Sequence, residues 1–175
     1  MATKRQKILA TESPISYEEF IGGVTPIDVN LAACKVDFER PQYFALKGDD
    51  SKVTRRLDAE CKVAFRYQSV IVVNASIQVQ MTRPGDGGEK EIAILNLVAE
   101  FDAFFSVEPL TEYPEDYAAR FAKTEAKIIV WPFLREFVAD VTTRMGMSPA
   151  IQIPLLLGRK PERQTVARRV GPAGK

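Results

Sequence analysis

Two stretches with an apolar residue at every second position most constrain how this chain can fold. Apolar side chains occupy alternate positions from 71 to 81, and again from 93 to 107. Successive side chains of a strand point to opposite faces of a sheet, so this period predicts two strands. In the second stretch Ile92, Ile94 and Val98 make the intervening positions apolar as well. A strand that is apolar on both faces fits the centre of a sheet or a subunit contact.

Two further strands are predicted upstream. Residues 57–65 alternate cleanly, which places Phe65 on the same buried face as Leu57. Residues 27–39 also alternate, but the phase changes between Ala33 and Cys34, and a bulge near 32–34 would keep one apolar face inward. Pro41 ends this strand, and residues 42–51 are expected to form a polar loop.

The last third of the chain changes to a helical period. Residues 113–116 open a helix with a proline followed by two acids. A second helix ends at Gly146, which suits the left-handed position after a helix, before Pro149 prevents continuation. Pro132 either starts this helix or kinks one that began earlier. Its apolar stripe comprises Leu134, Phe137, Val138, Val141 and Met145.

Strands followed by helices predict the α+β class, with a four-stranded antiparallel sheet followed by two C-terminal helices packed on one face. We expect the first and fourth strands to leave unpaired edges, and a sheet with open edges favours a homo-oligomer. The folded domain is expected to span residues 15–158.

The charge distribution separates the domain from both ends of the chain. Residues 159–175 carry a net charge of +5 and residues 1–12 a net charge of +2, so the remainder carries −6. We therefore expect residues 1–14 to form a basic N-terminal tail and residues 159–175 a basic, disordered C-terminal tail. The N-terminus has a basic start but no apolar core, so no secretion signal is predicted and a cytoplasmic location is expected.

Several classes of chemistry are disfavoured by composition. The chain has no histidine, which is the commonest general base and a common metal ligand. Cys34 and Cys61 lie too far apart for a metal-ligand spacing and are expected to be reduced, half-buried thiols. No apolar run approaches the roughly 20 residues that cross a bilayer. We expect no enzymatic activity, no cofactor, no metal and no membrane insertion.

The segment from 131 to 154 resembles the signature of SecB-type protein-export chaperones. The residues that carry this resemblance, in order, are Trp131-Pro132-Phe133, Arg135-Glu136, Arg144, Gly146, Ser148-Pro149 and Pro154. A weaker similarity links residues 37–41 to the end of the family's first strand, and residues 100–107 to its acidic and aromatic strand. The resemblance implies a dimer of dimers, with sheets stacked and helices at the tetramer centre.

The resemblance also implies a function: an ATP-independent holdase that binds unfolded polypeptide in an apolar groove. Apolar contact is non-directional, so such a groove accepts many sequences. The expected groove residues are Phe104, Trp131, Phe133, Phe137, Ile151, Ile153, Leu155, Leu156 and Leu157. The expected partner-docking surface comprises Glu39, Glu100 and Asp102.

Three roles remain open. Export members of the family dock a translocase motor on an acidic sheet surface, but Lys35 stands where they carry an acid. SecB-like proteins of another kind serve a toxin–antitoxin pair, and the basic tail with the weakened acidic face favours this role, with preprotein delivery to the Sec translocase as the alternative. A third alternative is nucleic-acid binding through the tail, although the body is acidic and no aromatics accompany the basic residues.

Overall fold

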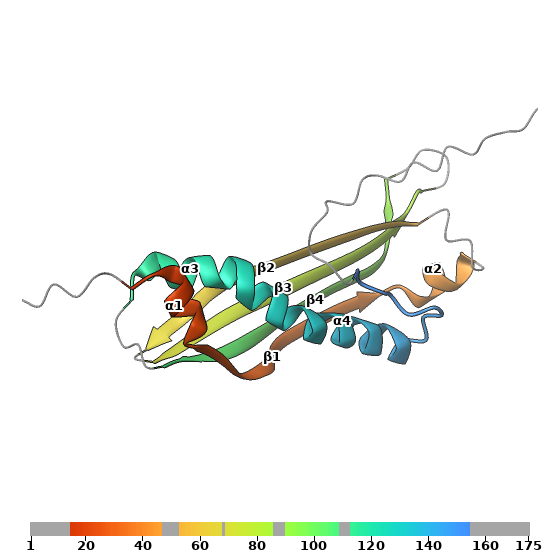
Figure 1. Cartoon of the computed structure of the whole chain (residues 1–175). Helices are drawn as coiled ribbons and strands as arrows, with labels where there is room; N and C mark the ends of the chain where they lie inside the picture. The colour runs from red at the N-terminus through yellow and green to blue at the C-terminus, as the bar shows by residue number, and fades with distance from the viewer. Residues whose placement is uncertain (1–14, 47–52, 68, 86–89, 109–112, 155–175) are drawn as a thin grey trace, which may run out of the picture. The chain divides into compact units, whose positions relative to one another are not determined.

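The computed structural model describes residues 15–46, 53–67, 69–85, 90–108 and 113–154. The expected tails and Leu155–Leu157 lie outside these residues. The chain divides into two compact units, residues 1–134 and 135–175, which are described in turn. The elements are α1 (Tyr17–Gly22), β1 (Val24–Phe38), α2 (Arg40–Ala45), β2 (Thr54–Tyr67), β3 (Val70–Arg83), β4 (Ile92–Val107), α3 (Glu115–Phe121), the π-helical turn η3 (Ala122–Ala126) and α4 (Lys127–Arg144) (Figure 1).

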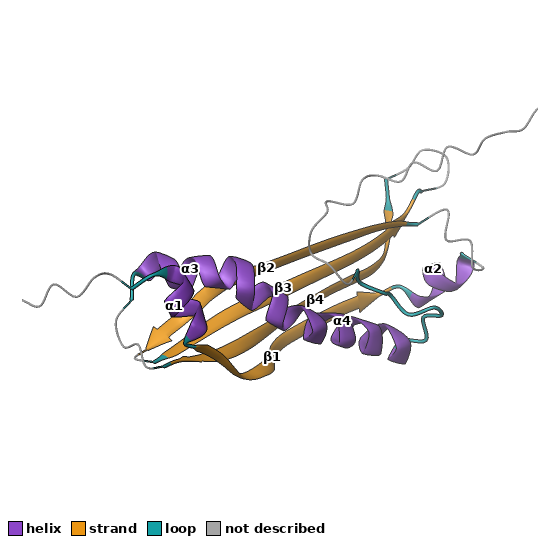
Figure 2. Ribbon diagram, viewed as in Figure 1, coloured by secondary structure: helices purple, strands orange, loops and turns teal. Residues whose placement is uncertain are grey.

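The first unit contains a four-stranded antiparallel sheet, which confirms the predicted α+β class (Figure 2). The strand order is β1-β4-β3-β2, so β4 is central and the sheet edges are β1 and β2. The prediction that the fourth strand leaves an open edge is therefore wrong. The double apolar character of β4 instead agrees with the central position that it suggested: Ile94 and Leu95 are both buried, one on each face of a strand that is paired on both sides.

The alternation of β3 and β4 defines the covered face of the sheet. Every second residue of β3 from Ile71 to Met81 is buried, as is every second residue of β4 from Leu95 to Val107. Phe105 meets the ring of Phe121 from α3 edge-on, with ring centroids 4.9 Å apart. The apolar face predicted from sequence is therefore the one on which the helix α3 packs.

The predicted bulge in the first strand is present. Leu31 pairs with Phe101 and Ala33 with Glu100, which leaves Ala32 as the extra residue. The bulge keeps Leu31 on the same face as the apolar residues that follow Cys34, because one inserted residue compensates the change of phase.

A second irregularity in β2 overturns one sequence expectation. Val63 pairs with Val73 but Phe65 pairs with Val72, so the extra residue Ala64 reverses the alternation. Phe65 therefore does not lie on the covered face against which α3 packs. It lies on the opposite face of the sheet, here called the open face, and is 56% exposed. Its ring stacks with that of Tyr67, with centroids 6.2 Å apart.

The helices differ from expectation in two respects. α3, η3 and α4 follow one another without a break from Glu115 to Arg144, so the two predicted C-terminal helices are joined by a π-helical turn. Pro132 lies inside α4 and does not start it. Pro114 and two acids do begin α3 as predicted. The second difference is α2, a short helix with Pro41 near its start, where a loop was predicted.

A cluster of aromatic rings fixes α1 against α3. Tyr17 meets Tyr117 edge-on with ring centroids 5.3 Å apart, and its hydroxyl donates to Glu125 Oε2 at 2.7 Å. The Arg120 guanidinium lies 3.8 Å from the centre of the Tyr17 ring. The fully buried Phe20 lies on the same face of α1 as Tyr17, with its ring 4.7 Å from the Tyr113 ring. Edge-on, tilted and cation–π contacts of this kind hold a six-residue helix that would not be stable alone.

Candidate functional site

The aromatic residues of the 131–133 motif lie in different environments on α4. Trp131 is buried, with 4% of its surface exposed, beside the buried Val130. Phe133 is 48% exposed, and Ile128 at the start of the helix is 70% exposed. Of the two motif aromatics, Phe133 is therefore the one accessible to another molecule in a single chain, while Trp131 belongs to the core.

In the second unit, α4 ends in a hydrogen-bonded turn built around Gly146. Gly146 adopts a positive φ of 83°, as its position predicts. The Gly146 amide donates to the Thr143 carbonyl at 2.9 Å, and the Met147 amide reaches back to the Thr142 carbonyl at 3.1 Å. These two bonds form a Schellman motif, which turns the chain sharply at the end of the helix.

The segment after this turn runs back along α4 and is held by two side chains of the helix. The Thr142 hydroxyl donates to the Val138 carbonyl at 2.8 Å and accepts from the Ile151 amide at 3.1 Å. Arg135 Nε donates to the Ile153 carbonyl at 2.9 Å. Because Ile151 bonds near the end of α4 and Ile153 bonds seven residues earlier, the segment is antiparallel to the helix.

Burial alternates along this segment. Ile151 and Ile153 are buried, whereas Gln152 and Pro154 are exposed. Phe137 of α4 is half-buried. The isoleucines expected to contact a client are thus covered in the single chain, and the remaining groove residues Leu155, Leu156 and Leu157 lie outside the described part.

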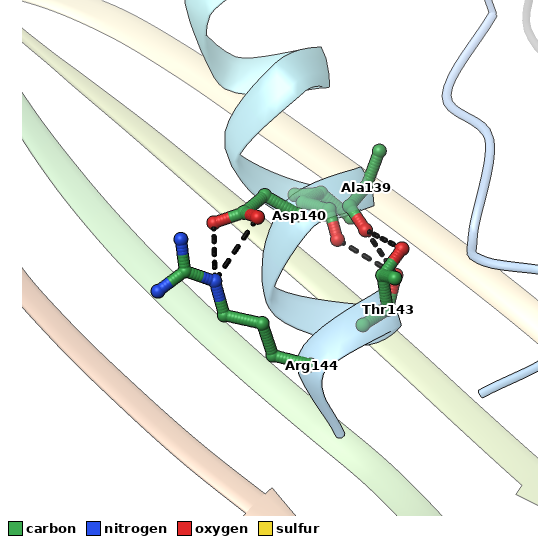
Figure 3. A network of polar contacts seen from close by, with 6 residues as sticks. Ala139, Asp140, Thr143 and Arg144 are labelled. Atoms are coloured by element: carbon green, nitrogen blue, oxygen red, sulfur yellow. Dashed lines mark hydrogen bonds and ion pairs between the residues drawn. The ribbon is translucent and has the colours of Figure 1, made fainter. Parts of the chain in front are cut away.

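The exposed side of α4 near its C-terminus is polar. Arg144 Nε lies 3.0 Å from both carboxylate oxygens of Asp140, and the Thr143 hydroxyl donates to the Ala139 carbonyl at 2.7 Å (Figure 3). An exposed pair four residues apart on a helix contributes only about 0.3–0.5 kcal/mol. This side therefore supports the helix end and offers no apolar surface.

Phe104 lies apart from the other expected groove residues of the first unit. It pairs with Val72 and Asp28 across the sheet and shares the parity of Asp102. Phe105, the next residue, occupies the opposite face against α3. Phe104 therefore belongs to the open face of the sheet, in the same cross-strand row as the exposed Phe65 of β2, with Val72 of β3 between them.

Two of the three expected docking acids lie together on this open face. Glu100 is exposed, and Asp102 accepts from Asn74 Nδ2 at 3.3 Å. The strand register adds a third acid, Glu60 of β2, to this face: Glu60 pairs with Ser76 of β3, and Ser76 pairs with Glu100. The sequence did not indicate Glu60, because its position beside Glu100 depends on the pairing of three strands. The third expected residue, Glu39, lies elsewhere. It follows β1, six residues beyond the partner of Glu100, roughly 20 Å along the strand.

The two thiols are in unlike environments, and neither matches the expected half-buried state. Cys34 on the edge strand β1 is exposed, and Cys61 on β2 is buried. Burial raises the pKa of Cys61 to about 11, against the opposing charge of Lys127. Lys127 itself donates to the Ala59 carbonyl at 2.8 Å. Among the described residues, no group of three His, Cys, Asp or Glu could hold a metal ion.

The fold has a clear relative among solved structures. The Mycobacterium tuberculosis Rv1957 SecB-like chaperone, solved in complex with a ChAD peptide from the Rv1956 HigA1 antitoxin, superposes with a TM-score of 0.63 at 20% identity. The match covers 82% of this chain and 96% of that one. This chain has the SecB-like fold.

Other comparisons add little to the SecB-like assignment. A protein of unknown function from Streptococcus agalactiae superposes with a TM-score of 0.40 at 10% identity, over 75% of this chain and 96% of that one. No family model and no curated protein matches the sequence. Within the described part of the chain, no helix is long and apolar enough to span a membrane.

Proposed function

We propose that this protein is an ATP-independent holdase chaperone that binds unfolded polypeptide on behalf of a toxin–antitoxin pair. The observation that carries the proposal is the likeness to a SecB-like chaperone solved with an antitoxin peptide, which extends over nearly all of that chain. A holdase needs an apolar surface of low directionality and no catalytic group.

The motif segment supplies surfaces of that kind. Phe133 exposes about half of its surface, whereas the alternating Ile151 and Ile153 of the segment after Gly146 are buried in the single chain and would contact a client only if that segment moved. Burying one aromatic or leucine side chain of a client is worth about 1.5–3 kcal/mol. Several such contacts would give useful affinity for an extended chain, although each is weak by itself.

The toxin–antitoxin role is preferred because the sheet surface is electrostatically mixed. Lys35 stands on β1 with its Nζ 3.3 Å from Asp37, so one of the acids of this strand is already neutralised. An acidic docking surface for a translocase motor is weakened accordingly. The alternative export role is supported by the acidic part of the same sheet: Glu60, Glu100 and Asp102 lie in adjacent rows of its open face.

We further propose that the working form is a cytoplasmic homotetramer. Strand β1 is an edge, and its apolar residues Ile27 and Leu31 are 58% and 49% exposed. Exposed apolar side chains on a free edge favour pairing with another copy.

The proposal is tested by aggregation of an unfolded client. Urea-denatured citrate synthase diluted into buffer should scatter less light when this protein is present in excess, without ATP. Phe133→Ser should weaken the suppression and leave thermal unfolding nearly unchanged. The matched control is Ile128→Ser, which removes an exposed apolar side chain from the same helix outside the motif, and it should retain suppression.

Two results would argue against this function. If the wild-type protein does not reduce scattering at any ratio, it is not a holdase. If Phe133→Ser and Ile128→Ser lose suppression equally, the motif aromatic has no special part in holding clients.

A further inference from the structure

The segment from Ala150 to Ile153 presents two unlike backbone edges. Its inner edge is occupied, because the Ile151 amide donates to Thr142 and the Ile153 carbonyl accepts from Arg135. The buried Ile151 and Ile153 side chains alternate with the exposed Gln152, which is the pattern of an extended chain.

In an extended chain the N–H and C=O of one residue point to the same edge, and those of the next residue point to the other. Since Ile151 and Ile153 use the inner edge, the backbone groups of Ala150 and Gln152 face the outer edge. Gln152 is exposed and Ala150 is half-buried. Within the described residues, no hydrogen bond to the backbone of either residue is present.

We propose that this outer edge binds the client by strand addition: an extended segment of unfolded polypeptide pairs with the backbones of Ala150 and Gln152. The inference rests on the proposed function and specifies how that site recognises its substrate. Two residues that each offer one donor and one acceptor match two alternate residues of an antiparallel strand, which is four hydrogen bonds.

The chemistry of the edge selects an extended polypeptide as its occupant. Donors and acceptors that alternate along one line are the complement of another backbone, and they read no side chain. Proline in the client at a paired position would remove a donor, so proline-free segments are preferred. Pro154 falls on the same edge as Ala150 and Gln152 and lacks an N–H group, so it offers no donor that would lengthen the ladder beyond Gln152. A short edge limits uncontrolled pairing between chaperones.

The inner contacts are the positioning device for this edge. Thr142 is wholly buried and its hydroxyl reaches Ile151, while Arg135 holds the Ile153 carbonyl. Both bonds come from one rigid helix, so they fix the direction of the Gln152 groups before a client arrives. Pre-organisation of this kind lowers the ordering cost of binding.

Amide hydrogen exchange, followed by NMR on the full chain, tests the inference directly. The probe is reduced, carboxymethylated α-lactalbumin, which stays unfolded. In the free protein the Ile151 amide should exchange slowly, and those of Ala150 and Gln152 quickly. With the probe bound, Ala150 and Gln152 should become protected by at least about tenfold, the range expected for new backbone hydrogen bonds.

Each other outcome counts against the inference. If the probe binds but Ala150 and Gln152 still exchange quickly, strand addition is wrong while the holdase function stands. If the probe does not bind, the proposed function falls and the inference falls with it. Protection without a probe that grows with protein concentration would show that a second copy occupies the edge. Protection without a probe that vanishes when residues 159–175 are deleted would assign the edge to this chain's own tail.

A pair of variants gives an independent reading. Gln152→Pro removes one outer donor and keeps its neighbour extended, whereas Gln152→Ala keeps both backbone groups. Gln152→Pro should bind the probe about three- to tenfold more weakly, the effect of one hydrogen bond, and Gln152→Ala should bind like the wild type. Equal affinity of the two variants, with equal melting temperatures, would overturn the proposal.

Discussion

The buried hydroxyl of Thr142 accepts a hydrogen bond of 3.1 Å from the amide of Ile151, and so ties the end of α4 to the segment that follows it. The same hydroxyl donates to the carbonyl of Val138. One side chain thus satisfies a backbone donor that would otherwise be buried without a partner.

Thr142→Val keeps the shape of this side chain and removes the hydroxyl. Because the Ile151 amide then stays buried without an acceptor, the free energy of unfolding should fall by about 1–3 kcal/mol. Urea denaturation measures the change. Thr143→Val is the matched control, since the exposed Thr143 hydroxyl donates to the Ala139 carbonyl of its own helix, and it should change stability by less than about 0.5 kcal/mol. Equal effects of the two variants would contradict the role given to Thr142.

The two cysteines should react at very different rates. At pH 8 a thiol reagent should label the exposed Cys34 in the folded protein and leave the buried Cys61 unmodified, because the pKa of Cys61 is raised to about 11 and the thiolate is the reactive form. Both should react in guanidinium. Mass spectrometry of the labelled peptides distinguishes the two sites, and fast labelling of Cys61 in the folded state would show that β2 opens.

The same raised pKa predicts how stability depends on pH. The folded state favours the protonated Cys61 thiol, so its contribution is fully present below pH 9 and is lost as pH rises through about 11. Denaturation midpoints measured between pH 8 and 11 should fall more steeply for the wild type than for Cys61→Ala. Parallel curves would show that Cys61 is not the group responsible.

The exposed edge of β1 should carry an interface between copies. The π-helical turn η3 covers β2, where Lys127 reaches the Ala59 carbonyl, whereas Leu31 on β1 remains 49% exposed. Light scattering should therefore give a multiple of the 19.5 kDa chain mass. Leu31→Glu should reduce that mass, and Leu57→Glu on the other edge strand should not. A wild-type mass of a single chain would contradict the oligomer.

Removal of residues 159–175 should leave folding unaffected. This sequence contains only Val166 and Val170 as sizeable apolar residues, too few to offset the entropy lost on ordering seventeen residues. The truncated protein should unfold at the same temperature as the full chain in a calorimetric scan. A drop of several degrees would show that the tail is part of the folded domain.

Local patterns in the sequence determined the character of most elements. A period of two defined β3 and β4 and the face that each buries, and the change of phase near Ala33 predicted a bulge within residues 32–34, which the strand register places at Ala32. Gly146 followed by Pro149 marked the end of α4. These features could be predicted because each depends on the conformational preferences of residues that are neighbours in the chain.

Only the tertiary structure decided features that depend on distant partners. The register against Val72 placed Phe65 on the open face, and pairing on both sides made β4 central. Contact between α4 and the segment after Gly146 buries Thr142. No pattern in the sequence indicated that this threonine has a structural role. The face of a strand to which a side chain points follows from the residues next to it in the chain. The place of that strand in the sheet, and the hydrogen-bond partner of a buried hydroxyl, depend on residues that are far apart in the chain.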